Sequence, residues 1–85
     1  MTRALDNSIN SLDAIIDVIG FHKHCESNGL EIAPLEQSNY NLMRQMGIAF
    51  AMLIPPATDE EILDKLTTLR DNLIERQTKG VTDGK

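Results

Sequence analysis

The sequence lacks tryptophan, and its only aromatic residues are Phe21, Tyr40 and Phe50. The core must therefore consist mainly of aliphatic side chains, which is typical of domains in which helices pack on helices. The single cysteine, Cys25, cannot close a disulfide within the chain, and no charged segment followed by an apolar one opens the sequence as in a secretory signal. We therefore expect a reducing, cytoplasmic location.

Basic residues are outnumbered, and long hydrophobic runs are missing. Eight lysines and arginines stand against 13 aspartates and glutamates, and the resulting formal charge of −5 repels nucleic-acid phosphates. The longest apolar run, residues 46–54, is about half of the ~20 residues that a membrane-spanning helix needs. We expect neither direct nucleic-acid binding nor a membrane span.

Two rows of apolar side chains predict the first helix. One row repeats every three or four residues, at Leu5, Ile9, Leu12, Ile16 and Ile19. The second row comprises Ala14, Val18, Phe21 and Cys25. Asp6 or Asn7 can cap the start and Gly29 can end the helix, so the pattern predicts a helix over residues 7–28. This helix has two apolar faces that need cover.

The middle of the chain predicts a second helix over residues 38–54. Ser38 can cap it, unless Pro34 lies in its first turn and moves the start earlier. Apolar side chains surround its second half, which indicates a buried helix with Phe50 at the centre of the core. Gly47 and Ala51, four residues apart, are small enough to let another backbone approach closely. A proline pair, residues 55–56, then ends the helix.

A capping box predicts the start of the third helix, over residues 59–77. Thr58 is followed three residues later by Glu61. The apolar stripe of this helix consists of Ile62, Leu66, Leu69 and Leu73. We therefore expect an all-α, three-helix bundle-like domain over residues 1–79, completed by dimerisation, with a flexible tail over residues 80–85.

The residue types that most suggest chemistry are His22, His24 and Cys25, because imidazole and thiolate are common metal ligands. On a helix, however, the two histidines point about 200° apart, and the chain has no second pair of ligands. We expect solvated histidines and a buried thiol. The sequence therefore predicts no metal site, no cofactor site and no catalytic residue.

Two other patterns remain as alternatives. Carboxylates recur at helical spacing, at Asp13 and Asp17, as in helical metal-dependent phosphohydrolase-like enzymes, but both should face solvent. A helix-turn-helix would need a basic third helix, whereas the exposed side over residues 59–77 mixes acids with bases. Neither pattern is complete.

The apolar side chains that the three helices leave over predict an interaction surface. The candidate interface residues are Ala14, Val18, Phe21, Cys25, Ile48 and Met52. We expect a homodimer and an unidentified protein partner, and hence a small non-enzymatic binding or regulatory protein. Compact acidic helical proteins of this kind are frequent among phage and plasmid accessory genes. An acidic inhibitor that mimics nucleic acid, of the anti-restriction or anti-CRISPR type, is the alternative within this class.

Overall fold

The computed structural model describes the backbone of residues 3–83 and the side chains of residues 6–78. It contains three helices, α1 (Arg3–Ser27), α2 (Pro34–Ala51) and α3 (Asp59–Asp83), and each helix packs against the other two. The predicted all-α, three-helix architecture is confirmed. The expected tail over residues 80–85 stays a prediction: the backbone of α3 continues to Asp83, and the side chains of that segment lie outside the described residues.

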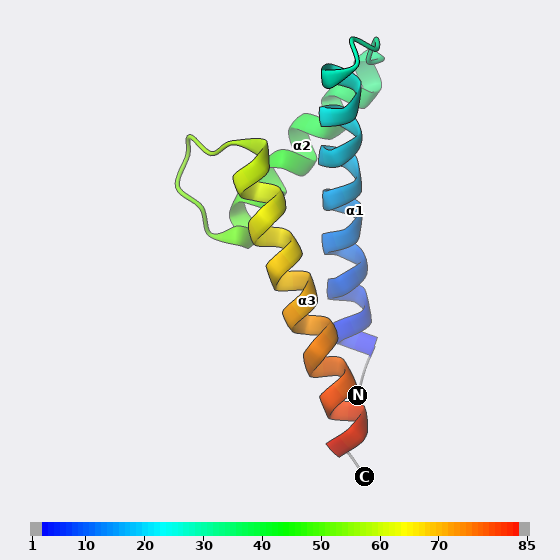
Figure 1. Ribbon diagram of the computed structural model, residues 1–85, viewed down its shortest axis with the longest axis vertical. Helices are drawn as coiled ribbons and strands as arrows, with labels where there is room; N and C mark the ends of the chain where they lie inside the picture. The colour runs from blue at the N-terminus through cyan, green and yellow to red at the C-terminus, as the bar shows by residue number, and fades with distance from the viewer. Residues whose placement is uncertain (1–2, 84–85) are drawn as a thin grey trace.

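The helices differ in length, and this gives the molecule an elongated shape of 50 × 24 × 19 Å. Figure 1 shows α1 and α3 side by side along the long axis, with the N- and C-terminal ends of the chain at the same end of the molecule. The shorter α2 crosses behind the other half of this pair (Figure 1). The N-terminal half of α1 and the C-terminal half of α3 therefore extend beyond the three-helix region as a pair.

The core lies where all three helices meet. Its four fully buried side chains are Ile15, Ile19, Ile62 and Leu66. Gly47 of α2 faces them, and a Cβ at this position would lie 2.9 Å from Ile62 Cγ2 and 3.1 Å from Leu66 Cδ1. Any side chain at this position would displace the core residues of α1 and α3, but the atoms that approach Gly47 belong to side chains and not, as predicted, to another backbone.

Local signals in the sequence account for most helix ends. Gly29 has a φ of +66° and follows the last turn of α1, as predicted. The Thr58 hydroxyl accepts a hydrogen bond from the Glu61 N–H at 3.1 Å, and the Glu61 carboxylate accepts one from the Thr58 N–H at 2.9 Å, so the capping box is confirmed. At α2 the proline signal prevails over Ser38, and the helix begins at Pro34.

The expectation that Phe50 lies at the centre of the core is wrong. Its side chain is 47% exposed, and that of Met52 is 87% exposed. Phe50 lies about 200° around α2 from the buried Ile48 and lines an opening between α1 and α3, while α2 ends at Ala51 with Met52 in the left-handed conformation. The last apolar residues of the run over residues 46–54 therefore lie in the connector to α3, and the centre of the core is formed by α1 and α3.

Across the described residues, no helix is both long and apolar enough to cross a membrane.

Candidate functional site

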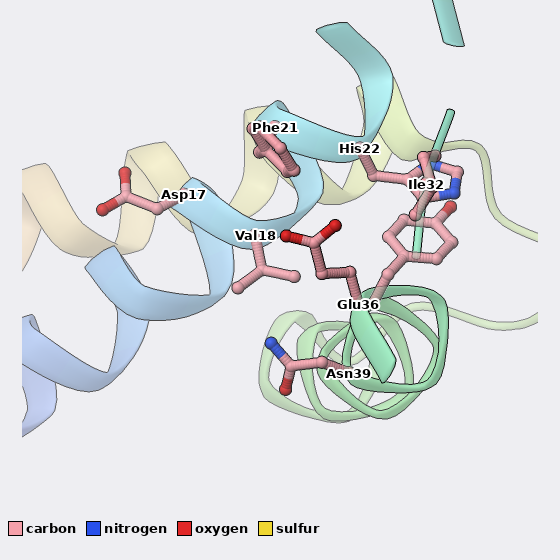
Figure 2. Close-up of a pocket in the computed structure, with 8 residues that line it drawn as sticks. Asp17, Val18, Phe21, His22, Ile32, Glu36 and Asn39 are labelled. Atoms are coloured by element: carbon pink, nitrogen blue, oxygen red, sulfur yellow. The ribbon is translucent and has the colours of Figure 1, made fainter. Parts of the chain in front are cut away.

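A groove between α1 and α2 combines apolar and acidic side chains (Figure 2). It encloses about 240 Å³ and is lined by Asp17, Val18, Phe21, His22, Ile32, Glu36, Asn39 and Tyr40. We call it the α1–α2 groove. Figure 2 shows Val18 and Phe21 of α1 across from Glu36 and Asn39 of α2, with His22 at one end. The ring of Tyr40 stacks on His22 at this end.

Helical periodicity brings these side chains to one place. The residues from α1 are spaced at i, i+1, i+4 and i+5, and those from α2 at i, i+3 and i+4, so each set occupies one side of its helix. Ile32 comes from the connector between the two helices. Phe21 is 52% exposed, whereas Val18 and Ile32 are half-buried. The groove therefore presents an apolar wall to solvent.

Two carboxylates give the groove a negative charge. Among the described residues, no side chain or backbone group forms a hydrogen bond or an ion pair with the carboxylate of Asp17. Glu36 accepts a hydrogen bond of 3.4 Å from the N–H of Ala33, which caps the start of α2. In Figure 2 its carboxylate is turned toward α1, over Val18. Negative charge thus stands beside exposed aromatic and aliphatic surface.

One end of the α1–α2 groove is closed by a stacked pair of rings. The rings of His22 and Tyr40 have centroids 3.5 Å apart and planes 9° from parallel. His22 Nε2 lies 3.2 Å from Gln37 Oε1. Because the Gln37 amide nitrogen donates to Asn41 Oδ1 at 3.2 Å, its oxygen is left to accept a hydrogen bond from His22 Nε2. The imidazole is held between α1 and α2.

The phenol of Tyr40 continues this contact to α3. Its hydroxyl lies 2.8 Å from both carboxylate oxygens of Asp59, in the first turn of α3, and donates to them. Arg44 Nε donates to Asp59 Oδ1 at 2.9 Å, and Arg44 also donates to the Ala57 carbonyl. Burial and the hydrogen bond to Asp59 raise the pKa of Tyr40 to about 12. The phenol therefore keeps its proton at neutral pH and ties α2 to α3.

The structure separates the six residues that the sequence predicts at an interface. Val18 and Phe21 come together in the α1–α2 groove, and Ala14 is exposed on the same helix. Met52 is exposed beyond the end of α2. Cys25 and Ile48 are buried by the chain itself, Ile48 within the core between the helices, so these two side chains offer no surface to a partner.

The histidines also differ from expectation. His22 is buried under Tyr40, so the prediction that it is solvated is wrong, whereas His24 is exposed and contacts Asn28. The thiol of Cys25 is buried, as predicted. Among the side chains of residues 6–78, no group of three His, Cys, Asp or Glu residues is placed to hold a metal ion. Asp13, one helical turn before Asp17 on α1, is bound by Arg70 at 3.1 Å.

Sequence reasoning missed the residues that close the groove. Tyr40 and Arg44 are one helical turn apart, and Asp59 follows the proline pair that folds the chain back. A buried tyrosine needs a polar partner for its hydroxyl, which is the signal that would have led to Asp59.

Comparison of the chain with models of protein families, with curated proteins and with solved structures gave no match.

Proposed function

We propose that this protein is a small non-enzymatic binding protein, and that its α1–α2 groove receives a basic side chain of a protein partner. The observation that carries the proposal is the carboxylate of Asp17, which has no hydrogen-bond or ion-pair partner among the described residues, one helical turn before the exposed ring of Phe21 on the same groove. A lysine or arginine has an aliphatic stem that packs on apolar surface and a cationic head that a carboxylate attracts. Phe21 adds a ring face for the cation.

The size of the groove supports a protein partner. Sites for drug-sized small molecules usually enclose about 300 to 1,000 Å³, whereas this groove has about 240 Å³. Such a volume suits a single side chain inserted from another protein surface. The closed end of the groove also favours binding over catalysis. The Tyr40 hydroxyl there already donates to Asp59 and is not available as a base or nucleophile.

The distribution of charge favours this function over nucleic-acid mimicry. A mimic needs a continuous acidic surface. Here Asp13, Asp59 and Glu60 are each paired with a basic side chain from another helix, namely Arg70, Arg44 and Lys23. The negative charge left at the α1–α2 groove is local, as expected for recognition of one basic residue.

The proposal can be tested with amphipathic peptides that are identical except for a central Arg, Lys or Glu. We expect the Arg and Lys peptides to shift the backbone amide resonances of Val18, Phe21 and Asn39. Asp17→Asn should weaken their binding about fivefold, since one charge contact contributes about 1 kcal/mol. Added salt should weaken it further.

Two further variants complete this experiment. Glu36→Gln removes the second charge but keeps an amide oxygen that can accept from the Ala33 N–H, so the start of α2 is preserved. The matched control is Asp64→Asn, which removes an exposed carboxylate from α3, away from the groove. Equal binding of the Glu and Arg peptides, or resonance shifts confined to other residues, would contradict the proposed function.

A further inference from the structure

The three-helix core stops where α2 ends, and the paired ends of α1 and α3 continue beyond it. At this point a second groove of about 320 Å³ opens between the helices. Its floor consists of Leu12, Phe50, Leu69 and Leu73. Phe50 and Leu69 are 47% and 37% exposed. The surface that α2 covers in one half of the molecule is therefore left open in the other half.

The surface that the chain exposes beyond a typical monomer has the size of one side of a stable protein interface. The chain exposes 5966 Å², about 900 Å² more than the ~5,050 Å² typical of a monomeric protein of this mass. A standard interface buries about 800 Å² on each partner. The radius of gyration, 14.8 Å, also exceeds the value of about 12 Å typical of a domain of this length. The chain is thus more extended than a typical domain, and association of two chains would bury an area of the size that it exposes in excess.

The lining of this second groove suits a second copy of the same chain. Apart from its apolar floor it contains only the neutral polar residues Asn7, Ser8 and Ser11, so no ion is desolvated when the groove is covered. The α1–α2 groove is different. A two-fold contact through it would bring the carboxylates of Asp17 and Glu36 of both copies together, and like charges across an interface repel.

We propose that two copies of this chain associate by a two-fold contact through the second groove, with Phe50 of each copy at its centre. The paired ends of α1 and α3 from the two copies then form a four-helix layer, and each copy supplies the cover that α2 gives elsewhere. The α1–α2 groove stays exposed in this dimer. The inference does not rest on the proposed function, since the two surfaces are separate.

Sedimentation of matched Phe-to-Ser variants tests this contact. At micromolar concentration the wild-type protein should have twice the 9.5 kDa mass of the chain. Phe50→Ser should reduce the mass to that of one chain, whereas Phe21→Ser, the same change in the α1–α2 groove, should leave the dimer intact. Both side chains are about half exposed, so the two substitutions remove similar amounts of packing within the chain.

A second variant keeps the test valid if Phe50→Ser does not fold. Ser8 is exposed and arginine is a good helix former, so Ser8→Arg leaves the fold of the chain intact but places a bulky charge at the rim of the second groove. We expect Ser8→Arg to sediment as a single chain with unchanged helix content. A single-chain mass for the wild type, a dimeric Ser8→Arg, or loss of the dimer in Phe21→Ser would each overturn the proposal.

Discussion

The imidazole of His22 lies flat on the phenol ring of Tyr40, with the ring centroids 3.5 Å apart. This contact joins α1 to α2, and the hydroxyl of the same tyrosine donates to Asp59 at the start of α3. The Tyr40 side chain of α2 thus contacts both α1 and α3 at the closed end of the α1–α2 groove. A change at Tyr40 should therefore affect stability and the shape of the groove together.

Titration of Tyr40 should be shifted upward. The ordinary pKa of 10.0 is raised to about 12 by burial and by the hydrogen bond to Asp59. Tyr40 is the only tyrosine and the chain has no tryptophan, so the ultraviolet absorbance of tyrosinate reports this group alone. A midpoint near 10 in the folded protein would contradict the observed burial and hydrogen bond.

Stability should fall as Tyr40 loses its proton. Because the folded-state pKa is above the unfolded value, this contribution is fully present below pH 10 and is lost as the pH rises toward about 12. Tyr40→Phe should lack this component of the pH dependence and should cost about 1 kcal/mol at neutral pH, the value of a typical hydrogen bond. Urea unfolding of both proteins at several pH values measures the difference.

Two glycine substitutions should have opposite effects. Gly47→Ala places a methyl group 2.9 Å from Ile62 Cγ2, and overpacking of this kind costs about 1 to 3 kcal/mol. Gly20→Ala meets no atom within 4 Å and should stabilise α1 by about 1 kcal/mol, since alanine is the better helix former. Thermal unfolding followed by circular dichroism compares them. Equal shifts in both variants would contradict the packing at Gly47.

Loss of the α3 cap should cost about 1 kcal/mol. Thr58→Ala removes the hydroxyl that accepts from the Glu61 N–H. The matched control is Thr68→Ala, because the Thr68 hydroxyl only donates to the Asp64 carbonyl within the helix. We expect that control to change the free energy of unfolding by less than about 0.5 kcal/mol. Chemical denaturation of the three proteins gives the comparison.

Zinc and a strong chelator should leave the melting temperature and helix content unchanged. His22 is turned toward Tyr40 and His24 toward Asn28, so the two imidazoles do not converge with Cys25 on one ion. Specific binding would stabilise the fold by about 2.7 kcal/mol at a hundredfold excess over the dissociation constant. A zinc-dependent rise in melting temperature that is lost in His24→Ala would contradict this prediction.

The sequence by itself determined the three helices and most of their ends. Thr58 with Glu61, Gly29 and the residue 55–56 proline pair act within a few residues of their own positions, so no distant contact is needed to interpret them. The lack of a side chain at Gly47 also indicated a close contact, although side chains and not a backbone approach it. These signals are local, and local backbone chemistry decides them.

Only the tertiary structure decided which apolar residues are covered. Phe50 and Ile19 both belong to apolar helix faces, yet Phe50 is half exposed and Ile19 is buried, because burial depends on how α2 crosses α1 and α3. The candidate site has the same origin. His22, Tyr40 and Asp59 come from three different helices, and no spacing along the chain specifies that their side chains meet. Their proximity follows from helix packing, which is a property of the whole chain.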